Sequence, residues 1–285
     1  MFSNEDSPSC PPEQMDSGRC KYNRKRPDLS GTTCCLFTNT DFVSCTCSGN
    51  GGAISFSNAA SGTLTVSWCF FSSCTCTTTS TREDECGGGA IYVNSVSKVV
   101  VSSSLFSSCA CYSSNGCDGG AIELWSISFQ PLISICIFNL CRAADDGGAL
   151  SIWESSGLNP FVCTDCTFLS CNCGGTGGCL IMWGNSEEFK GCNMLFASGR
   201  AAHGGAFATS SSSSHPNYEI LFCFFLRNTA SSGNDILFSV LPSDLPILHC
   251  LSTSDPQRIA YWQNKNTFSV DYSNWLPIGV IATPT

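Results

Sequence analysis

Cysteine and histidine are the residues of this chain best suited to nucleophilic catalysis or metal binding, and their spacing limits both. A cysteine nucleophile needs a histidine as its base. The three histidines, His203, His215 and His249, lie in unrelated contexts, and none is matched to one cysteine. Cys163 and Cys166 form a Cys-x-x-Cys pair of the kind that can hold zinc. Because Cys166 also belongs to a regular column of cysteines, described below, we interpret the pair as structural, with zinc as the alternative.

Acidic side chains could serve as general acids and bases on a polysaccharide or could hold calcium. Asp118 and Asp165 fall at different positions of the repeat described below, and Asp145 and Asp146 share one loop. The run Glu83 to Glu85 lies in an insertion. We therefore predict solvated loop charges, with no catalytic pair, no metal and no cofactor.

Three tryptophans are the candidates for a binding site. Trp125, Trp153 and Trp183 each stand four residues after the third position of a glycine-rich motif. If equivalent residues of successive repeats stack, these side chains form an outward-facing aromatic column about 10 Å long. Such a column could hold sugars or a partner chain. The alternative is that the tryptophans pack at a corner beneath neighbouring loops.

A repeat must position all of these residues. Its first motif is Gly-Gly-Ala-apolar, with a degenerate last copy, and starts at Gly51, Gly88, Gly119, Gly147, Gly177, Gly204 and Gly233. The second motif is Phe-x-x-Cys, which loses its cysteine in the last two copies, and starts at Phe42, Phe71, Phe106, Phe138, Phe168, Phe196 and Phe225. The distance from each glycine doublet to the next Phe is nearly constant, at 17 to 20 residues, whereas the return half varies. A fixed half and an extensible half indicate stacked coils with loops on one side.

Apolar and small residues alternate after each glycine doublet, which is the period of a strand and not of a helix. The sequence therefore predicts an all-β protein, a right-handed parallel β-helix of about seven coils over residues 34–240. Residues 1–33 are rich in proline, serine and charge and are predicted to be a disordered or loosely docked leader. Residues 241–285 are predicted to cap the last coil.

Most of the 23 cysteines fall on regular columns of this β-helix. Two residues before the Phe lie Cys69, Cys136, Cys166 and Cys223. Three residues after it lie Cys45, Cys74, Cys109, Cys141 and Cys171, and five after it lie Cys47, Cys76, Cys111 and Cys173. Alanine replaces cysteine in the last column, so we expect buried thiols that pack as small apolar groups. Stacked disulfides and metal ligands are the alternatives.

Composition and charge limit the classes of molecule that this protein is expected to bind. A net charge of −9 argues against nucleic acid, because phosphate binding needs a basic surface. No apolar stretch is long enough to predict a membrane span, and the first residues lack the pattern of a secretory signal peptide. The basic run from Arg19 to Arg26 is interpreted as part of a solvated leader, with a nuclear-import or membrane-surface signal as the alternative.

The pairing of Gly-Gly-Ala-Ile with Phe-x-x-Asn-like motifs resembles the repeats of chlamydial polymorphic outer-membrane proteins. The cysteine- and serine-rich form seen here resembles their counterparts in trichomonad protozoa, and the resemblance covers about residues 34–240. In the bacterial repeats the third residue after Phe is usually Asn; Asn228 keeps it, and Cys replaces it in five copies. The resemblance implies a surface adhesin, at the cell surface or secreted.

Two classes of function remain. The first is a non-catalytic recognition or adhesion module that binds a glycan or a host or cell-surface protein along one face, with the three tryptophans as its site. The alternative is a carbohydrate-active enzyme, a lyase or hydrolase built on a β-helix. Because the sequence shows no convergent catalytic groups, we expect the first.

Overall fold

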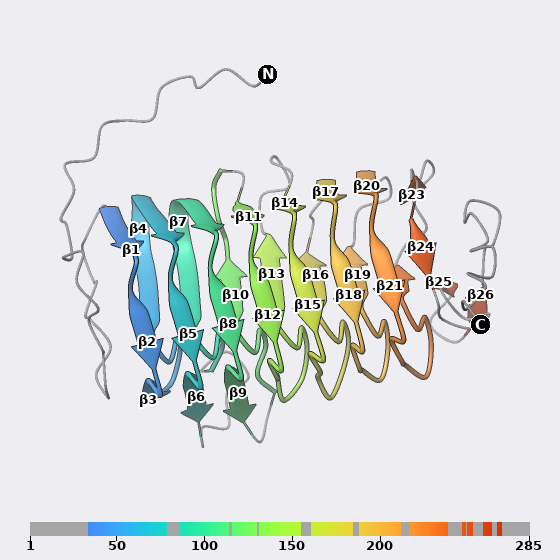
Figure 1. Ribbon diagram of the computed structural model, residues 1–285, viewed down its shortest axis with the longest axis horizontal. Coiled ribbons are helices and arrows are strands. Elements are labelled where there is room, and N and C mark those ends of the chain that lie inside the picture. The colour runs from blue at the N-terminus through green and yellow to red at the C-terminus, as the bar shows by residue number, and fades with distance from the viewer. Residues whose placement is uncertain are drawn as a thin grey trace, which may run out of the picture.

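The computed structural model is all β, and its strands wind into a parallel β-helix (Figure 1). It describes residues 34–78, 86–113, 116–129, 131–154, 161–184, 188–211, 217–238, 247–248, 250–252, 259–263 and 267–269. The predicted fold class is confirmed, with about six turns against the seven expected. Among the described residues no helix is long and apolar enough to cross a membrane.

The largest sheet has 15 strands. The first full coils each contribute one long strand to it, whereas later coils contribute two shorter strands each. The sheet therefore continues from β7 as two rows, one through β10 and one through β11. Every pairing in it is parallel except that of β25 with β26. Its strands are β1 (Cys34–Thr38), β4 (Ile54–Ser67), β7 (Ile91–Ser102), β10 (Ile122–Trp125), β11 (Leu132–Ser134), β13 (Leu150–Glu154), β14 (Phe161–Thr164), β16 (Leu180–Gly184), β17 (Glu188–Cys192), β19 (Phe207–Ser211), β20 (Asn217–Leu221), β22 (Ile236–Phe238), β23 (Ile247–Leu248), β25 (Ile259–Gln263) and β26 (Thr267–Ser269).

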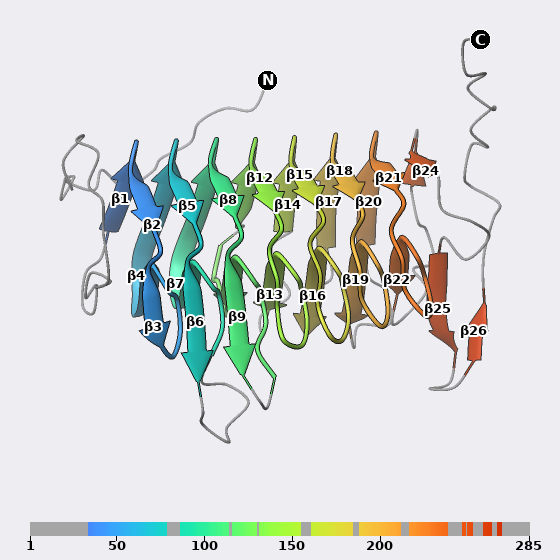
Figure 2. The same cartoon turned by 60° about the horizontal axis from the view of Figure 1, so that its bottom comes forward.

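Two smaller sheets complete the coil. The second has eight strands in coil order: β2 (Asp41–Val43), β5 (Phe70–Ser72), β8 (Leu105–Ser107), β12 (Ile137–Asn139), β15 (Thr167–Leu169), β18 (Leu195–Ala197), β21 (Phe224–Leu226) and β24 (Leu251–Ser252). The third joins only three neighbouring coils near the N-terminal end (Figure 2): β3 (Thr46–Ser48), β6 (Thr75–Thr78) and β9 (Ala110–Ser113).

The predicted phenylalanine column runs through the interior. Phe42 is followed, one coil at a time, by six further phenylalanines that end at Phe225, and neighbouring rings stack with centroids 4.6–5.1 Å apart. All seven rings are fully buried. The ring spacing matches the distance between paired strands, about 4.8 Å. The register predicted from the motif spacing is therefore confirmed.

Each glycine doublet has two separate reasons to be glycine. The first glycine has a left-handed backbone, as at Gly119 with φ of 64°, which a side chain disfavours. The second has an ordinary φ, but a Cβ on Gly120 would collide with the carbonyl oxygen of Gly148 in the next coil. The doublet thus marks a corner at which consecutive coils approach closely.

Two further corners in each coil use the left-handed backbone without glycine. One column of such residues has φ between 49° and 55° and comprises Asn39, Trp68, Ser103, Ile135, Asp165, Asn193 and Phe222. The other has φ between 52° and 58° and comprises Ser44, Ser73, Ser108, Leu140, Ser170, Ser198 and Arg227. The stacked neighbours hold these residues in a conformation that costs roughly 1 kcal/mol each.

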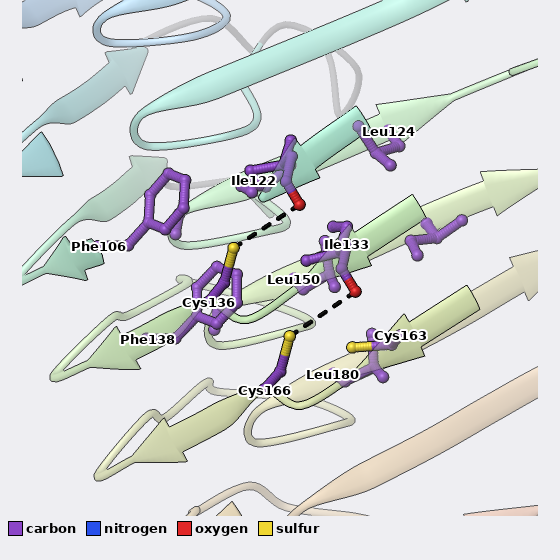
Figure 3. Close-up of a cluster of buried hydrophobic side chains, with 14 of the residues drawn as sticks. Phe106, Ile122, Leu124, Ile133, Cys136, Phe138, Leu150, Cys163, Cys166 and Leu180 are labelled. Atoms are coloured by element: carbon purple, nitrogen blue, oxygen red, sulfur yellow. Dashed lines mark hydrogen bonds between the residues drawn. The ribbon is translucent and has the colours of Figure 1, made fainter. Parts of the chain in front are cut away.

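Cysteines of the first column act as hydrogen-bond donors at the corner. The thiol of Cys166 lies 3.2 Å from the carbonyl oxygen of Thr164 and 3.7 Å from that of Ile133 in the preceding coil (Figure 3). Ser104 occupies the same column, and its hydroxyl donates to the carbonyl oxygen of Ser102 at 2.8 Å. The cysteine thiol therefore makes the same corner hydrogen bond as the serine hydroxyl, to the carbonyl oxygen two residues before it.

The second column explains why Cys can replace Asn in this repeat. The Cys141 thiol lies 3.7 Å from the carbonyl oxygen of Phe106 in the preceding coil. Asn228 donates from Nδ2 to the equivalent oxygen of Phe196 at 3.2 Å. Both side chains satisfy a buried carbonyl of the neighbouring coil. The prediction of buried thiols is confirmed for these two columns.

Residues 1–33, predicted to be a leader, lie outside the described residues. Within 241–285, predicted to cap the last coil, β23, β24 and β25 pair in parallel with β20, β21 and β22. The antiparallel pairing of β26 with β25 follows them.

Candidate functional site

The three predicted tryptophans lie on neighbouring strands of the largest sheet, β10, β13 and β16. Trp125 pairs with Trp153, and Trp153 with Trp183, in exact strand register. Their rings stack with centroids 4.7 Å and 5.0 Å apart at interplanar angles of 13° and 14°. The predicted stack is thus confirmed, and its role in ligand binding stays a prediction.

The stack is neither a fully exposed stripe nor a buried corner. All three side chains are partly exposed. Because neighbouring rings are stacked, both faces of Trp153 are covered by tryptophan, and only the edges of its ring are left for a ligand. Trp183 also packs against Ile181, Ala208 and Leu237, a small apolar cluster outside the main core.

The tryptophan stack borders a cavity of about 270 Å³. Carboxyl groups contribute much of the remaining lining, and they belong to Asp118, Glu123, Asp145 and Asp146. The other lining residues are Cys86, Tyr92, Gly116 and Cys117. No lysine, arginine or histidine is found among the described residues that line the cavity. The tryptophans and the acids, which the sequence analysis treated separately, thus share one site, here named the Trp–Asp cavity.

The prediction of solvated loop charges is wrong for Asp146, which is buried, and for Asp118, which is partly buried and stacks with it, whereas Asp145 is exposed as predicted. Carboxylate oxygens of Asp118, Asp145 and Asp146 lie within 4.8 Å of one another. Asp118 and Asp146 both stand directly before a glycine doublet, so stacking of the coils brings them together. The sequence does signal this pairing when positions are counted back from the glycine doublet. The signal is missed when positions are counted forward from the Phe motif, because that distance varies between coils.

Hydrogen bonds fix the acids in place. The backbone N–H of Asp146 donates to Oδ1 of Asp118 at 3.0 Å. Oδ1 of Asp146 in turn accepts a short hydrogen bond from the backbone N–H of Thr176 in the next coil. The carboxyls of Asp118 and Asp146 are therefore each held by the coil that follows, before any ligand arrives.

Burial dominates the electrostatics of this cluster. Loss of water raises the pKa of Asp118 to about 7, aided by the charge of Asp145; the Asp146 N–H, and weakly the Trp153 indole, oppose the shift. Burial and the charge of Asp118 raise the pKa of Asp146 to about 7 as well. The Trp153 Nε1 atom lowers the pKa of Asp118 only weakly, because no acceptor lies in hydrogen-bonding geometry to it. Crowded carboxyls of this kind favour a bound proton or an incoming positive charge.

The other sequence candidates do not join this site. Cys163 and Cys166 are buried in the core (Figure 3), so their structural interpretation is supported. His203 lies in a different coil, with Nδ1 2.6 Å from the hydroxyl of Ser232. His215 and His249 lie outside the described residues, as does the run 83–85.

Comparison of this chain with known protein families, with characterised proteins and with solved structures finds no match.

Proposed function

We propose that this protein is a non-catalytic recognition module, and that its Trp–Asp cavity binds a cationic group presented by a glycan or by a partner protein. The observation that carries the proposal is the convergence of Asp118, Asp145 and Asp146 beside three stacked tryptophans. An amino sugar or a lysine side chain would supply the same chemistry, an ammonium group on a partly apolar stem.

Charge supports a cation over a neutral sugar. The cavity holds four carboxyl groups and, within its described lining, no basic side chain, in a chain of net charge −9. A neutral sugar would bind best by stacking on a free aromatic face, and both faces of Trp153 are covered. An ammonium group would bond to the carboxylates directly and offset their mutual repulsion.

A calcium ion fits less well. Calcium takes about six to eight oxygen ligands. In this cluster Asp118 and Asp146 each use an oxygen to accept a backbone N–H. The ring edges of the tryptophans supply no oxygen at all, so an organic cation matches both walls of the cavity.

The test compares each ligand with the form in which acetylation removes the positive charge of its amino group. Glucosamine oligomers are titrated against N-acetylglucosamine oligomers, and a lysine-rich peptide against its acetylated form, by calorimetry in calcium-free buffer. We expect the charged ligand of at least one pair to bind at least about tenfold more tightly, a difference of about 1.4 kcal/mol. The pair that shows the difference identifies the source of the cation. Equal binding within both pairs would contradict the proposal.

Matched variants locate the binding site. Asp146→Asn and Trp153→Ala should each weaken binding of the charged ligand about tenfold. Asp165→Asn removes a charge at a corner outside the cavity, and Trp68→Ala removes a tryptophan that is 68% exposed and also outside it. Both controls should bind as the wild type does. Loss of binding in the controls, or unchanged binding in both cavity variants, would refute the assigned site.

One observation favours a second candidate, the carbohydrate-active enzyme. Two carboxyl groups with a pKa near 7 in one cavity are a property of general acids and bases. A turnover screen on acidic and neutral glycans separates the two functions. Product formation that is lost in Asp146→Asn would favour the enzyme, and binding without turnover would favour the recognition module.

A further inference from the structure

Four cysteine thiols converge outside the interior columns, at the edge of the third sheet. Cys86 Sγ lies 3.1 Å from Cys76 Sγ and 3.0 Å from Cys117 Sγ. Cys76 and Cys117 are 4.0 Å apart, and with Cys111 their sulfurs all lie within 4.8 Å of one another. All four side chains are buried. Each of the four sulfurs thus has at least one other sulfur as a close neighbour.

Two neighbouring coils supply two cysteines each. Cys76 on β6 and Cys111 on β9 are direct strand partners. Cys86 and Cys117 come after those strands, at the ends of the two longest connections between a Phe motif and the next glycine doublet. The residues that follow them, Gly87 and Asp118, are also paired in parallel. The four ligands therefore lie on backbone that the β-helix holds in register.

Cysteines at the same position in other coils share one kind of contact with Cys111, whose thiol lies 3.3 Å from the carbonyl oxygen of Asp118, but their coils lack the additional cysteine. Cys173 donates its thiol to the carbonyl oxygen of Thr176 at 3.3 Å, and Cys47 donates to that of Gly49 at 3.3 Å. Neither of these coils carries an additional cysteine before its glycine doublet. The sulfur cluster thus occurs where the two longer connections bring in Cys86 and Cys117.

We propose that Cys76, Cys86, Cys111 and Cys117 bind one Zn²⁺ ion. Zinc in structural sites is tetrahedral, and Zn–S bonds of about 2.3 Å place the sulfurs roughly 3.8 Å apart. The observed separations of 3.0, 3.1 and 4.0 Å lie around this value, and Cys111 lies within 4.8 Å of Cys76 and Cys117. Cys86 is outside that group of three, so the site closes when the Cys86 and Cys111 side chains move toward each other. Each thiol loses its proton to solvent on binding, and four thiolates with one Zn²⁺ leave a net charge of −2.

The thiols compete for protons in the absence of metal. Contact with Cys111 raises the pKa of Cys76, and burial, followed by contact with Cys111, raises the pKa of Cys117. Contact with Cys117 lowers the pKa of Cys86, but contact with Cys76 and burial outweigh it and raise that pKa to about 12. Burial alone would raise the pKa of Cys111, yet its thiol neighbours lower it.

Strand geometry disfavours one of the disulfide pairings. Cys76 and Cys111 are direct partners on parallel strands, about 4.8 Å apart. A disulfide needs its Cβ atoms at about 3.5–4.5 Å. Disulfides would therefore have to join each strand cysteine to Cys86 or Cys117, and they remain the outcome against which zinc is tested.

The ion would support the proposed binding site. Cys86 and Cys117 line the Trp–Asp cavity together with Gly116. A tetrahedral ion that joins both connections to β6 and β9 would fix this wall, as structural zinc fixes loops that have little core of their own. The zinc site does not depend on the nature of the ligand that the cavity takes.

The test measures metal in the whole 285-residue chain, purified with a reductant and no chelator. We expect about one zinc per chain by mass spectrometry of the metal, and a Co²⁺ form with the absorption of a tetrahedral tetrathiolate. Cys86→Ser and Cys117→Ser should each lower zinc affinity at least about tenfold. Cys173→Ser, the matched control in another coil, should keep full occupancy.

Three outcomes would contradict the zinc site, provided that the variants are folded. Circular dichroism first confirms that each variant keeps its β structure, and Cys117→Ala provides a second variant if Cys117→Ser fails to fold. A folded wild type without zinc, even after addition of Zn²⁺ under reducing conditions, would overturn the site. Peptide mapping that finds Cys86 or Cys117 in a disulfide in the reduced preparation would do the same, as would zinc retained in both serine variants.

Discussion

The substitution Asp146→Asn tests whether the cavity holds a proton on this side chain. Burial, helped by the charges of Asp118 and Asp145, raises the pKa of Asp146 from 3.8 to about 7 in the folded protein. The folded chain therefore keeps a proton that the unfolded chain loses above about pH 4. The stability contributed by this proton is full at low pH and is lost as the pH rises through the window between about 4 and 7.

The pH dependence of the free energy of unfolding that one side chain can cause has an upper limit. One fully buried group changes the free energy of unfolding by at most about 1.4 kcal/mol per pH unit. The two units from pH 5 to pH 7 thus give at most about 3 kcal/mol, and because Asp118 shares the proton we expect about 1–2 kcal/mol. Asparagine keeps an oxygen that can accept the Thr176 N–H and carries no charge, so Asp146→Asn should lose this dependence.

Urea unfolding at pH 5, 6 and 7, followed by circular dichroism, measures the difference between variant and wild type. We expect the advantage of Asp146→Asn to grow by about 1–2 kcal/mol from pH 5 to pH 7. Asp165→Asn is the control, since Asp165 is exposed and accepts a hydrogen bond from Asn193 at 2.7 Å. A difference between Asp146→Asn and wild type that is the same at all three pH values would refute the reasoning.

Three further predictions concern the scaffold, and urea midpoints check each. Gly120→Ala should destabilise the protein by more than about 3 kcal/mol, because its Cβ would collide with the Gly148 carbonyl; a midpoint equal to wild type would contradict this. Ile135 is 60% exposed with φ of 55°, and Ile135→Asn should stabilise by about 1 kcal/mol, since Asn tolerates this conformation better; a lower midpoint would oppose it. Cys141→Leu should cost about 1–3 kcal/mol, and Cys141→Asn should cost less, because only Asn can donate to the Phe106 carbonyl as Asn228 does to that of Phe196; the reverse order would count against the shared role.

The interior of this protein is predictable from its sequence because each coil repeats the same contacts. The spacing between Gly52 and Phe71 recurs almost unchanged in every coil, and strands stacked in register leave only one place for each such residue. Phenylalanines and tryptophans at equal repeat positions therefore stack as expected. The left-handed corners could not be predicted, because Ile135 and Phe222 share them with serine and carry no turn signal.

The candidate sites are harder to predict because they lie where the repeat varies. Asp118 and Asp146 align only when positions are counted back from the glycine doublet, and the connection before that doublet differs in length between coils. Cys86 and Cys117 fall outside the regular columns for the same reason. Their meeting with Cys76 and Cys111 depends on how two longer connections fold back, which motif spacing alone does not determine.

The central claim is that coils stacked in register bring Trp125, Trp153 and Trp183 into one column, and circular dichroism of the coupled indoles tests it most directly. The stack has two neighbour contacts, of 4.7 Å and 5.0 Å, and both involve Trp153. Trp153→Phe should therefore abolish nearly all of the couplet, while Trp125→Phe or Trp183→Phe should remove about half. Equal losses from all three substitutions would show that the rings are not stacked and would contradict the account.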